Sequence, residues 1–392
     1  MSTLENSIHG AGSRIVIFWG GRGNGHIHAA RAVAERIQLQ NPQAEVILKD
    51  VMEFQDRFDY FFITGSYHLM TKYFPRVYDW IFEDFLRKAE GVDSIGGLSI
   101  TRRYRPERLL QYLELVRPTS VLTTFSPATE AIVWLRDRGQ LKNIPVAQVL
   151  IDYVSAKYFS RLGERIEMTF VPSESIYGDF RAWGLPSSKL CNSGIPVALA
   201  ATEPMSDFEK AEFRMTHGLA SGVPLIVLVS GAAGVGNYPL WVKTLVRELK
   251  TRAQLVAICG RDKRHVARLS KLQRTLPSHL SLKILPLVAQ DETLRFMKCS
   301  DVIVTKTGGL TSTEIASFGK PVLFLDINGG QETHNSQFFK KEGMGLVTEN
   351  QAEVGGLVQR LLAERETQER ILAAQQKYRT ALDPDAIARW AV

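Results

Sequence analysis

Short apolar runs alternate along the chain with stretches in which apolar residues recur at helical spacing. Strands are predicted at 14–19, 45–51, 120–124, 145–151, 168–171, 224–229, 255–259, 282–285, 302–304 and 322–325. Helices are predicted at 28–39, 109–116, 127–138, 174–183, 311–318, 352–382 and 384–392. Strands separated by helices favour parallel sheets, because parallel neighbours need a long crossover. The predicted fold class is therefore α/β.

Two glycine-rich loops mark the starts of two similar halves. GGRGNGH at 20–26 and SGAAGVGN at 230–237 each follow an apolar strand and precede a helix. A glycine loop between a strand and a helix is the opening unit of a doubly wound domain. The chain is thus predicted to form two doubly wound domains, 1–199 and 200–380, with a final helix in 381–392 that crosses back to the first.

The first glycine loop ends in a histidine. His26 takes the third glycine position of a dinucleotide fingerprint, and no Gly-Lys-Ser/Thr follows as in a Walker loop. A helix start beside the imidazole favours its neutral form, which a general base needs. The residues alone support equally a second interpretation, in which His26 only packs or caps the helix. His28 is expected to point elsewhere, which argues against a His-x-His metal pair.

The stretch 304–335 is predicted to form a strand, a glycine turn, a helix, a strand and a polar loop. The exposed N–H groups and the dipole at the helix start suit a phosphate, and Gly308 and Gly309 let the backbone approach it. Glu314 lies one turn further, where a carboxylate can accept both hydroxyls of a ribose. The polar loop offers groups that hold sugar hydroxyls: Gln331, Glu332, His334 and Asn335. An ordinary crossover is the alternative, but two polar clusters at consecutive strand ends favour a ligand site.

One further carboxylate follows a predicted strand. Asp152 comes directly after 145–151, at the end of the strand where ligands of α/β sheets bind. We expect it to orient His26 or to bind a second substrate.

Composition bounds these interpretations. The 392 residues are 45% hydrophobic and 23% charged, with a formal net charge of +7, so the chain is globular and long enough for two cores. A basic surface suits anionic lipid, nucleic acid or phosphorylated substrates. The three cysteines are far apart and form no CxxC pair, which indicates neither a zinc site nor a disulfide framework and favours a reducing compartment. We find no apolar run long enough to span a bilayer and no apolar core in the first residues that would indicate a secretory signal.

The glycine-turn and polar-loop residues carry a family resemblance. The run GGLTSTEIASFGKPVLFLDINGGQETHN resembles the nucleotide-sugar site of glycosyltransferase family 28. That family includes the monogalactosyl- and glucosyl-diacylglycerol synthases and the N-acetylglucosaminyltransferase that makes lipid II. Its pattern is a glycine turn, a Glu on the helix, and a Gln-Glu or Gln-Gln pair followed by Asn. The first loop also resembles the Gly-Gly-Gly-His loop of the lipid glycosyltransferases, with Asn24 as a departure, and this favours His26 as a base.

The resemblance implies a GT-B fold and an inverting transfer from a UDP-sugar to a lipid. His26 and Asp152 are the expected catalytic residues. The expected donor-binding residues are Gly231, Arg261, Thr307, Gly308, Gly309, Thr311, Glu314, Gln331, Glu332 and Asn335. No metal and no cofactor besides the donor are expected, because helix-end electrostatics and Arg261 would replace a metal ion.

The segment 54–88 is dense in aromatic and basic residues. Core helices are one explanation, and an element at a membrane surface is the other. The segment resembles the part of the diacylglycerol glycosyltransferases in which a proline lies between aromatic helices. The expected acceptor and membrane residues are Tyr67, Tyr73, Phe74, Tyr78 and Trp80. The expected partners are a membrane lipid acceptor and an anionic membrane surface, at the cytoplasmic face of the bacterial inner membrane, and not nucleic acid.

The acceptor stays open at this stage. The family usually has Thr-Asp with His and Trp a few residues on, whereas this chain has Ile151-Asp152 and then Lys157-Tyr158. Diacylglycerol, a glycolipid and a polyprenyl-linked sugar all remain as acceptors. A UDP-sugar 2-epimerase of the same architecture and a non-catalytic binding protein are the two alternatives of other classes.

Overall fold

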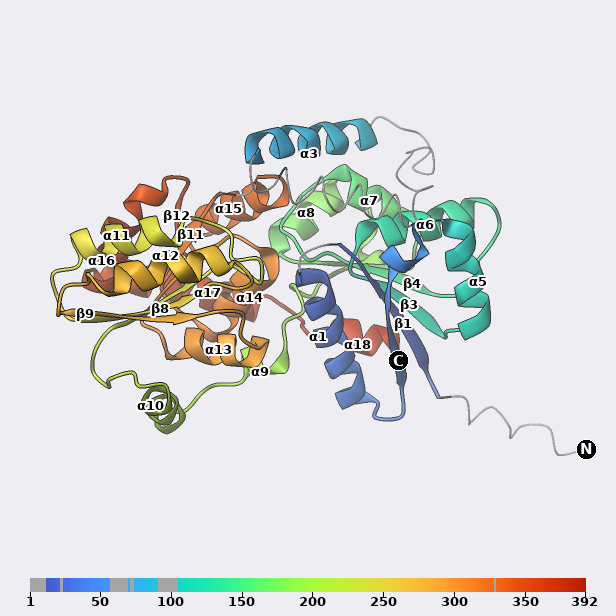
Figure 1. Ribbon diagram of the computed structural model, residues 1–392. Coiled ribbons are helices and arrows are strands. Elements are labelled where there is room, and N and C mark those ends of the chain that lie inside the picture. The colour runs from blue at the N-terminus through green and yellow to red at the C-terminus, as the bar shows by residue number, and fades with distance from the viewer. Residues whose placement is uncertain (1–11, 22–23, 57–69, 71–73, 91–104, 328) are drawn as a thin grey trace, which may run out of the picture.

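Two parallel sheets organise the chain within residues 12–21, 24–56, 70, 74–90, 105–327 and 329–392, which the computed structural model describes (Figure 1). The first sheet has the order β2-β1-β3-β4-β5-β6, and the second has the order β12-β11-β10-β7-β8-β9. The strands of the first sheet are β1 (Arg14–Trp19), β2 (Glu45–Asp50), β3 (Ser120–Thr123), β4 (Val146–Val149), β5 (Met168–Val171) and β6 (Leu190–Asn192). Those of the second are β7 (Leu225–Val229), β8 (Ala253–Ile258), β9 (Leu280–Leu285), β10 (Val302–Lys306), β11 (Val322–Leu325) and β12 (Leu346–Thr348).

Helices cover both faces of each sheet. Those of the first half are α1 (Gly25–Gln40), α3 (Pro75–Glu90), α5 (Pro106–Val116), α6 (Ser126–Asp137), α7 (Lys157–Glu164), α8 (Glu174–Ala182) and α9 (Leu199–Thr202). Those of the second are α10 (Asp207–Thr216), α11 (Tyr238–Glu248), α12 (Lys263–Gln273), α13 (Gln290–Cys299), α14 (Gly309–Phe318), α15 (Gln331–Lys341), α16 (Val354–Ala363), α17 (Arg365–Thr380) and α18 (Ala386–Ala391). Short 3-10 helices are η1 (Val51–Phe54), η3 (Ser187–Lys189) and η4 (Gln351–Glu353).

The predicted strands are confirmed to within two residues at each end. They are recognisable because a parallel sheet buried on both faces needs almost continuous apolar strands, as in LIVLV of β7 and VLFL of β11. β6 and β12 were not predicted, since strands of three residues are too short to show a period.

Two helix predictions need correction. The single helix expected at 352–382 is two helices, because Glu364 leaves the helical conformation between them with φ −96° and ψ 94°. The polar loop expected at 331–335 is the start of α15. The site region therefore contains two helix N-termini, that of α14 and that of α15.

Each sheet reverses its strand order at one point. In the first sheet the reversal lies between β1 and β3, and in the second it lies between β7 and β10. The loops after these strands leave in opposite directions and open a crevice at the carboxyl edge of the sheet, which is where α/β proteins bind ligands. The described residues of the first glycine loop, 20–21 and 24–26, and the loop at 230–237 lie at the carboxyl edges of their sheets.

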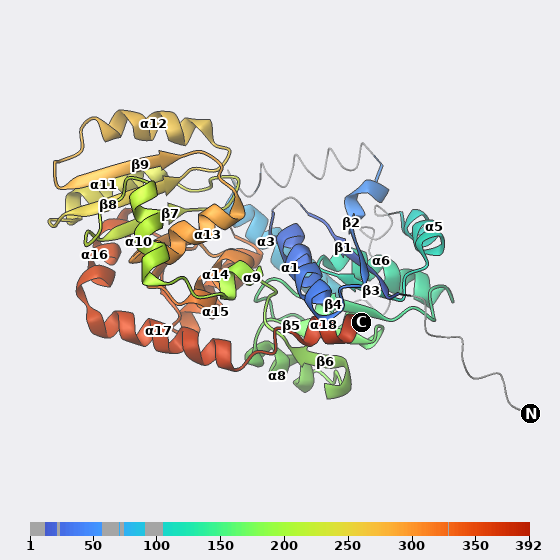
Figure 2. The same cartoon turned by 90° about the horizontal axis from the view of Figure 1, so that it is seen from below.

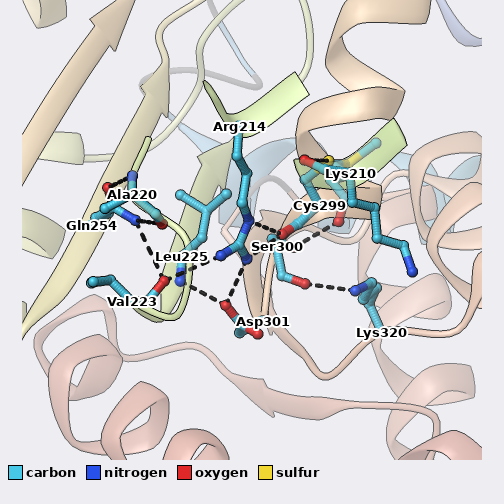
Figure 3. Close-up of polar contacts among 11 residues, drawn as sticks. Lys210, Arg214, Ala220, Val223, Leu225, Gln254, Cys299, Ser300, Asp301 and Lys320 are labelled. Atoms are coloured by element: carbon cyan, nitrogen blue, oxygen red, sulfur yellow. Dashed lines mark hydrogen bonds and ion pairs between the residues drawn. The ribbon is translucent and has the colours of Figure 1, made fainter. Parts of the chain in front are cut away.

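The opposite edge of the second sheet is fixed by polar contacts (Figure 3). Arg214 of α10 donates to the carbonyl of Cys299 at 2.6 Å and to the carboxylate of Asp301 at 3.0 Å. Asp301 also accepts the backbone N–H of Leu225 at the start of β7, and Lys320 donates to the carbonyl of Ser300 at 2.7 Å. These contacts tie α10 to the amino ends of β7 and β10 and leave the carboxyl ends free for a site.

The chain returns to the first sheet at its end. Figure 2 shows α17 running beneath the second sheet toward the first, where α18 lies against α1 and β3. Arg36 of α1 forms an ion pair with Asp385 at 2.9 Å, and the hydroxyl of Ser120 donates to the carbonyl of Ala391 at 2.9 Å. Buried apolar residues of both halves form one continuous cluster between the sheets.

Candidate active site

The carboxyl edges of the two sheets face a shared cavity of about 1060 Å³. The first sheet contributes the loops after β1, β3 and β4 to its wall, and the second contributes those after β7, β8 and β10. Both predicted glycine loops and the Gly308 turn thus open onto the same space. The cavity is therefore lined by both domains.

His26 is held in one orientation at the wall of this cavity. It is the second residue of α1, because the helix begins at Gly25 rather than at His28 as predicted. Its Nδ1 lies 2.5 Å from the carbonyl oxygen of Thr124. A carbonyl only accepts hydrogen bonds, so the ring proton sits on Nδ1 and Nε2 keeps its lone pair. Burial lowers the pKa of His26 from 6.5 to about 4, against a smaller opposing effect of the Thr124 hydrogen bond, so the ring is neutral at pH 7.

His28 also lines the cavity, but as expected its ring points elsewhere than that of His26, toward the second domain. Its Nδ1 contacts the side-chain oxygen of Gln290, the first residue of α13. Gln290 in turn donates from Nε2 to Glu314 at 2.8 Å. The start of α1 thus brings His28 against the second domain, while His26 is bound to Thr124 of the first. No local sequence signal marks Gln290, because it comes from a distant helix start.

Glu314 is a buried carboxyl group at the floor of the second domain's crevice. It is 4% exposed, and burial raises its pKa to about 7, against the opposing effect of the hydrogen bond from Gln290. The group is therefore close to half ionised at neutral pH. Its depth in α14 places it behind the helix N-terminus, as predicted for a group that binds the hydroxyls of a ligand.

Lys306 is a cation between two glycine turns, and sequence analysis missed it. An ideal Cβ on Gly308 would lie 3.0 Å from its Nζ, and one on Gly231 would lie 3.4 Å from its Cε. Its ammonium forms an ion pair with Glu332 in the first turn of α15. The signal was present, since Lys306 is the last residue of an apolar strand and therefore lies at the ligand edge of the sheet.

Two family models match most of the chain between them. The monogalactosyldiacylglycerol synthase model matches residues 26–197, and the glycosyltransferase family 28 C-terminal domain matches residues 225–389. The chain belongs to glycosyltransferase family 28. The resemblance of the sequence to this family is confirmed, and the protein is a glycosyltransferase.

Known proteins resemble this family 28 glycosyltransferase over almost its whole length. A processive diacylglycerol beta-glucosyltransferase of Staphylococcus saprophyticus is 25% identical over 341 residues, which are 85% of this chain and 81% of that protein. MurG from Acinetobacter baumannii has a TM-score of 0.61 at 17% identity, covering 97% of this chain and 98% of that one. A UDP-GlcNAc 2-epimerase from Neisseria meningitidis bound to UDP-GlcNAc has a TM-score of 0.57 at 14% identity, covering 96% and 97%. The two structures share the fold, and the predicted GT-B arrangement is confirmed.

Several predicted site residues of the glycosyltransferase form the seam between its domains. Asn335 is fully buried, donates to the carboxylate of Asp152 at 2.8 Å, and accepts the backbone N–H of Tyr153 at 2.6 Å. The orienting partner of His26 is thus Thr124, while Asp152 is bound to the second domain. Burial raises the pKa of Asp152 to about 6, against the hydrogen bond from Asn335. An ideal Cβ on Gly309 would lie 2.1 Å from the carbonyl oxygen of Ile151, so this cavity-lining glycine also permits close contact between the domains.

The remaining predicted donor residues divide into two groups. The hydroxyl of Thr307 is buried and donates to the carbonyl of Glu332 at 3.0 Å, so it holds the start of α15 in place. Arg261, Thr311 and Gln331 line the cavity directly. All of these were predicted to bind the donor, because the turn and the helix start carry both kinds of residue next to each other.

The predicted acceptor segment is described in part. Tyr67 and Tyr73 lie outside the described residues. Phe74 and Trp80 are 54% and 64% exposed, whereas Tyr78 turns toward α15 and donates to Gln331 at 3.1 Å. Within the ranges that the structure describes, every helix is too short or too polar to cross a bilayer.

Proposed function

We propose that this protein transfers a hexose from a UDP-sugar to diacylglycerol with inversion at the anomeric carbon, and that His26 is the general base. The observation that carries the proposal is the tautomer of His26, which the hydrogen bond to Thr124 fixes with the lone pair on Nε2. His26 lines the same cavity as Lys306 and Glu314 of the other domain. The similarity to the Staphylococcus saprophyticus diacylglycerol beta-glucosyltransferase supports diacylglycerol as acceptor and glucose as the sugar. A beta product from an α-linked nucleotide sugar requires inversion.

The second domain supplies the proposed donor site. The N–H groups at the start of α14 and the side chain of Lys306 meet the diphosphate, since anions bind at helix N-termini and beside cations. Arg261 approaches the same charge from the loop after β8. Glu314 accepts hydrogen bonds from the ribose hydroxyls, and Gln331 and Glu332 accept hydrogen bonds from hydroxyls of the sugar.

The proposed reaction is a single displacement. Nε2 of His26 takes the proton of the acceptor hydroxyl while that oxygen forms a bond to the anomeric carbon. The bond between the anomeric carbon and the diphosphate oxygen breaks, and its electron pair leaves with UDP. Lys306 and the α14 N-terminus stabilise the negative charge that develops on this oxygen, in a cavity where such interactions are stronger than in water. No step of this scheme requires a cofactor besides the donor.

The acceptor is proposed to reach the cavity from a membrane surface beside α3. Exposed Phe74 and Trp80 belong to an aromatic and basic segment of the kind that binds at the interface of a bilayer. The net charge of +7 favours an anionic surface, and we propose the cytoplasmic face of the bacterial inner membrane as the place of action. The protein would bind there peripherally.

The test measures transfer of radiolabelled sugar into the lipid phase of diacylglycerol-containing liposomes from UDP-glucose, UDP-galactose and UDP-N-acetylglucosamine. We expect label in the diacylglycerol fraction for the wild type and its loss by at least about 100-fold in His26→Ala, the usual contribution of a general base. UDP binding serves as the control, because His26 lies in the other domain and its removal leaves UDP affinity unchanged.

Three outcomes would contradict parts of this proposal. Label only in liposomes that carry an undecaprenyl-linked sugar would replace diacylglycerol with a polyprenyl acceptor. Transfer that survives in His26→Ala would remove the base assignment. Conversion of a UDP-sugar to its 2-epimer without transfer to any lipid would favour the epimerase that shares this fold.

A further inference from the structure

α3 exposes an apolar face to solvent. Phe74, Val77, Trp80 and Ile81 are each between 41% and 64% exposed. Successive residues of a helix are about 100° apart, so these four lie on one side of α3. A row of aromatic and branched side chains in water is costly, and it fits the boundary between lipid headgroups and acyl chains.

The opposite face of α3 touches the start of α15. The carboxylate of Asp79 accepts the backbone N–H of Gly330 at 2.8 Å, the hydroxyl of Tyr78 donates to Gln331 at 3.1 Å, and Glu83 accepts from Nε2 of His334 at 2.6 Å. Figure 1 shows α3 lying across the top of the molecule above both domains, and it also packs against α7 of the first domain. One helix therefore connects an exposed apolar surface with the proposed sugar-binding turn.

The turn that α3 contacts contains two adjacent glycines. Gly329 and Gly330 both have positive φ, at 72° and 62°, and two adjacent glycines lose more conformational entropy on ordering than other residues do. An ideal Cβ on Gly330 would lie 2.4 Å from the ring of Tyr78, so the close approach of α3 depends on this glycine. Gln331 follows at once and accepts the hydroxyl of Tyr78, so its position depends directly on α3, whereas Glu332 is also held by Lys306 and Thr307.

We propose that α3 couples the membrane to the donor site: when its apolar face binds a lipid bilayer, its other face orders the 329–332 turn and strengthens binding of the donor's sugar. The inference rests on the proposed function, because it assigns Gln331 and Glu332 to the sugar. Asp79 is a positioning residue in this scheme, since it acts through Gly330. Coupling between two binding events is reciprocal, so a UDP-sugar strengthens membrane binding by the same factor.

The experiment measures the affinities of UDP-glucose and of UDP by calorimetry, with and without vesicles of phosphatidylglycerol and phosphatidylcholine that lack diacylglycerol. For the wild type we expect vesicles to tighten UDP-glucose binding at least about fivefold, the low end of typical coupling, and to leave UDP affinity nearly unchanged. UDP-glucose should tighten vesicle binding, measured as an affinity from sedimentation at a series of lipid concentrations, by the same factor.

Variants of α3 separate the coupling from a general loss of structure. Asp79→Ala removes the acceptor of the Gly330 N–H and should abolish the vesicle effect, while Asp79→Asn keeps an acceptor oxygen and should restore it. Asp84→Ala is the matched control, because Asp84 pairs with Arg87 within α3 and should leave the effect intact. Thermal unfolding of each variant verifies that the fold is kept.

The coupling is overturned if vesicles leave wild-type UDP-glucose affinity unchanged, or if Asp79→Ala weakens UDP and UDP-glucose equally. Both results are compatible with sugar transfer to diacylglycerol, so the proposed function would stand. A wild type that binds UDP-glucose no better than it binds glucose, and that transfers no sugar, would overturn the proposed function and the coupling together.

Discussion

Gly309 gives the sharpest prediction about how the two domains meet. In Gly309→Ala the new Cβ would lie 2.1 Å from the carbonyl oxygen of Ile151 and 2.9 Å from a carboxylate oxygen of Asp152. Restoring an ordinary contact of 3.4 Å to Ile151 requires a separation of about 1.3 Å, the difference between 3.4 and 2.1 Å. Because one partner is backbone and the carboxylate of Asp152 is held by Asn335, no flexible end can move aside.

The separation breaks hydrogen bonds that join the domains. Asn335 donates to Asp152 at 2.8 Å and accepts from the N–H of Tyr153 at 2.6 Å, and a further 1.3 Å takes both contacts beyond hydrogen-bond reach. Asn335 is fully buried, so its amide would lose these partners without access to water. Overpacking of this kind and unpaired buried polar groups each cost about 1–3 kcal/mol, and we expect a loss of about 2–4 kcal/mol in the free energy of unfolding.

Differential scanning calorimetry checks the prediction. A loss of about 2–4 kcal/mol lowers the melting temperature of a domain of this size by about 4–16 °C. Gly356→Ala is the control, because Gly356 is an exposed residue within α16 with open space around its Cα. An alanine there should raise stability by about 0.5–1 kcal/mol through helix propensity. If Gly309→Ala melts at the wild-type temperature, the close contact between α14 and the loop after β4 is not formed in solution.

Three further predictions concern titration and charge at the site. The pKa of His26 is lowered to about 4 in the folded protein against 6.5 when unfolded, so the free energy of unfolding should fall as pH falls from about 6.5 toward 4. Urea unfolding at several pH values should show this loss for the wild type. An equally steep loss in His26→Gln would argue against it. The pKa of Glu314 is raised to about 7, so UDP binding that needs its ionised form should weaken as pH falls through 7, by up to about tenfold per pH unit. Glu314→Gln should bind UDP weakly at every pH. Calorimetry at pH 6 and 8 decides this. Lys306→Met should weaken UDP binding by about tenfold or more, since a charge-assisted contact contributes about 1.5–3 kcal/mol, and should leave uridine binding unchanged. An equal loss of affinity for both ligands would place Lys306 away from the diphosphate.

The sequence by itself determined the features that depend on neighbours along the chain. Apolar runs such as VLFL mark strands because both faces of a parallel sheet are buried. The glycine turn before α14 and the position of Glu314 within that helix follow from helix geometry, which is fixed by spacing. For the same reason the α/β class and the doubly wound halves were predictable before any tertiary contact was known.

Only the tertiary structure decided which polar residues face the cavity and which join the domains. Asp152 and Asn335 lie 183 positions apart and meet because the two sheets approach at that point. Their hydrogen bonds use the same amide and carboxylate groups that would bind a sugar, so residue type alone does not separate the two roles. The packing of the domains likewise decides that three further residues line the cavity, namely His28, Lys306 and Gln290. Periodicity along the chain determines which residues share a face of a strand or helix. The packing of one domain on the other determines which residues or ligands that face contacts.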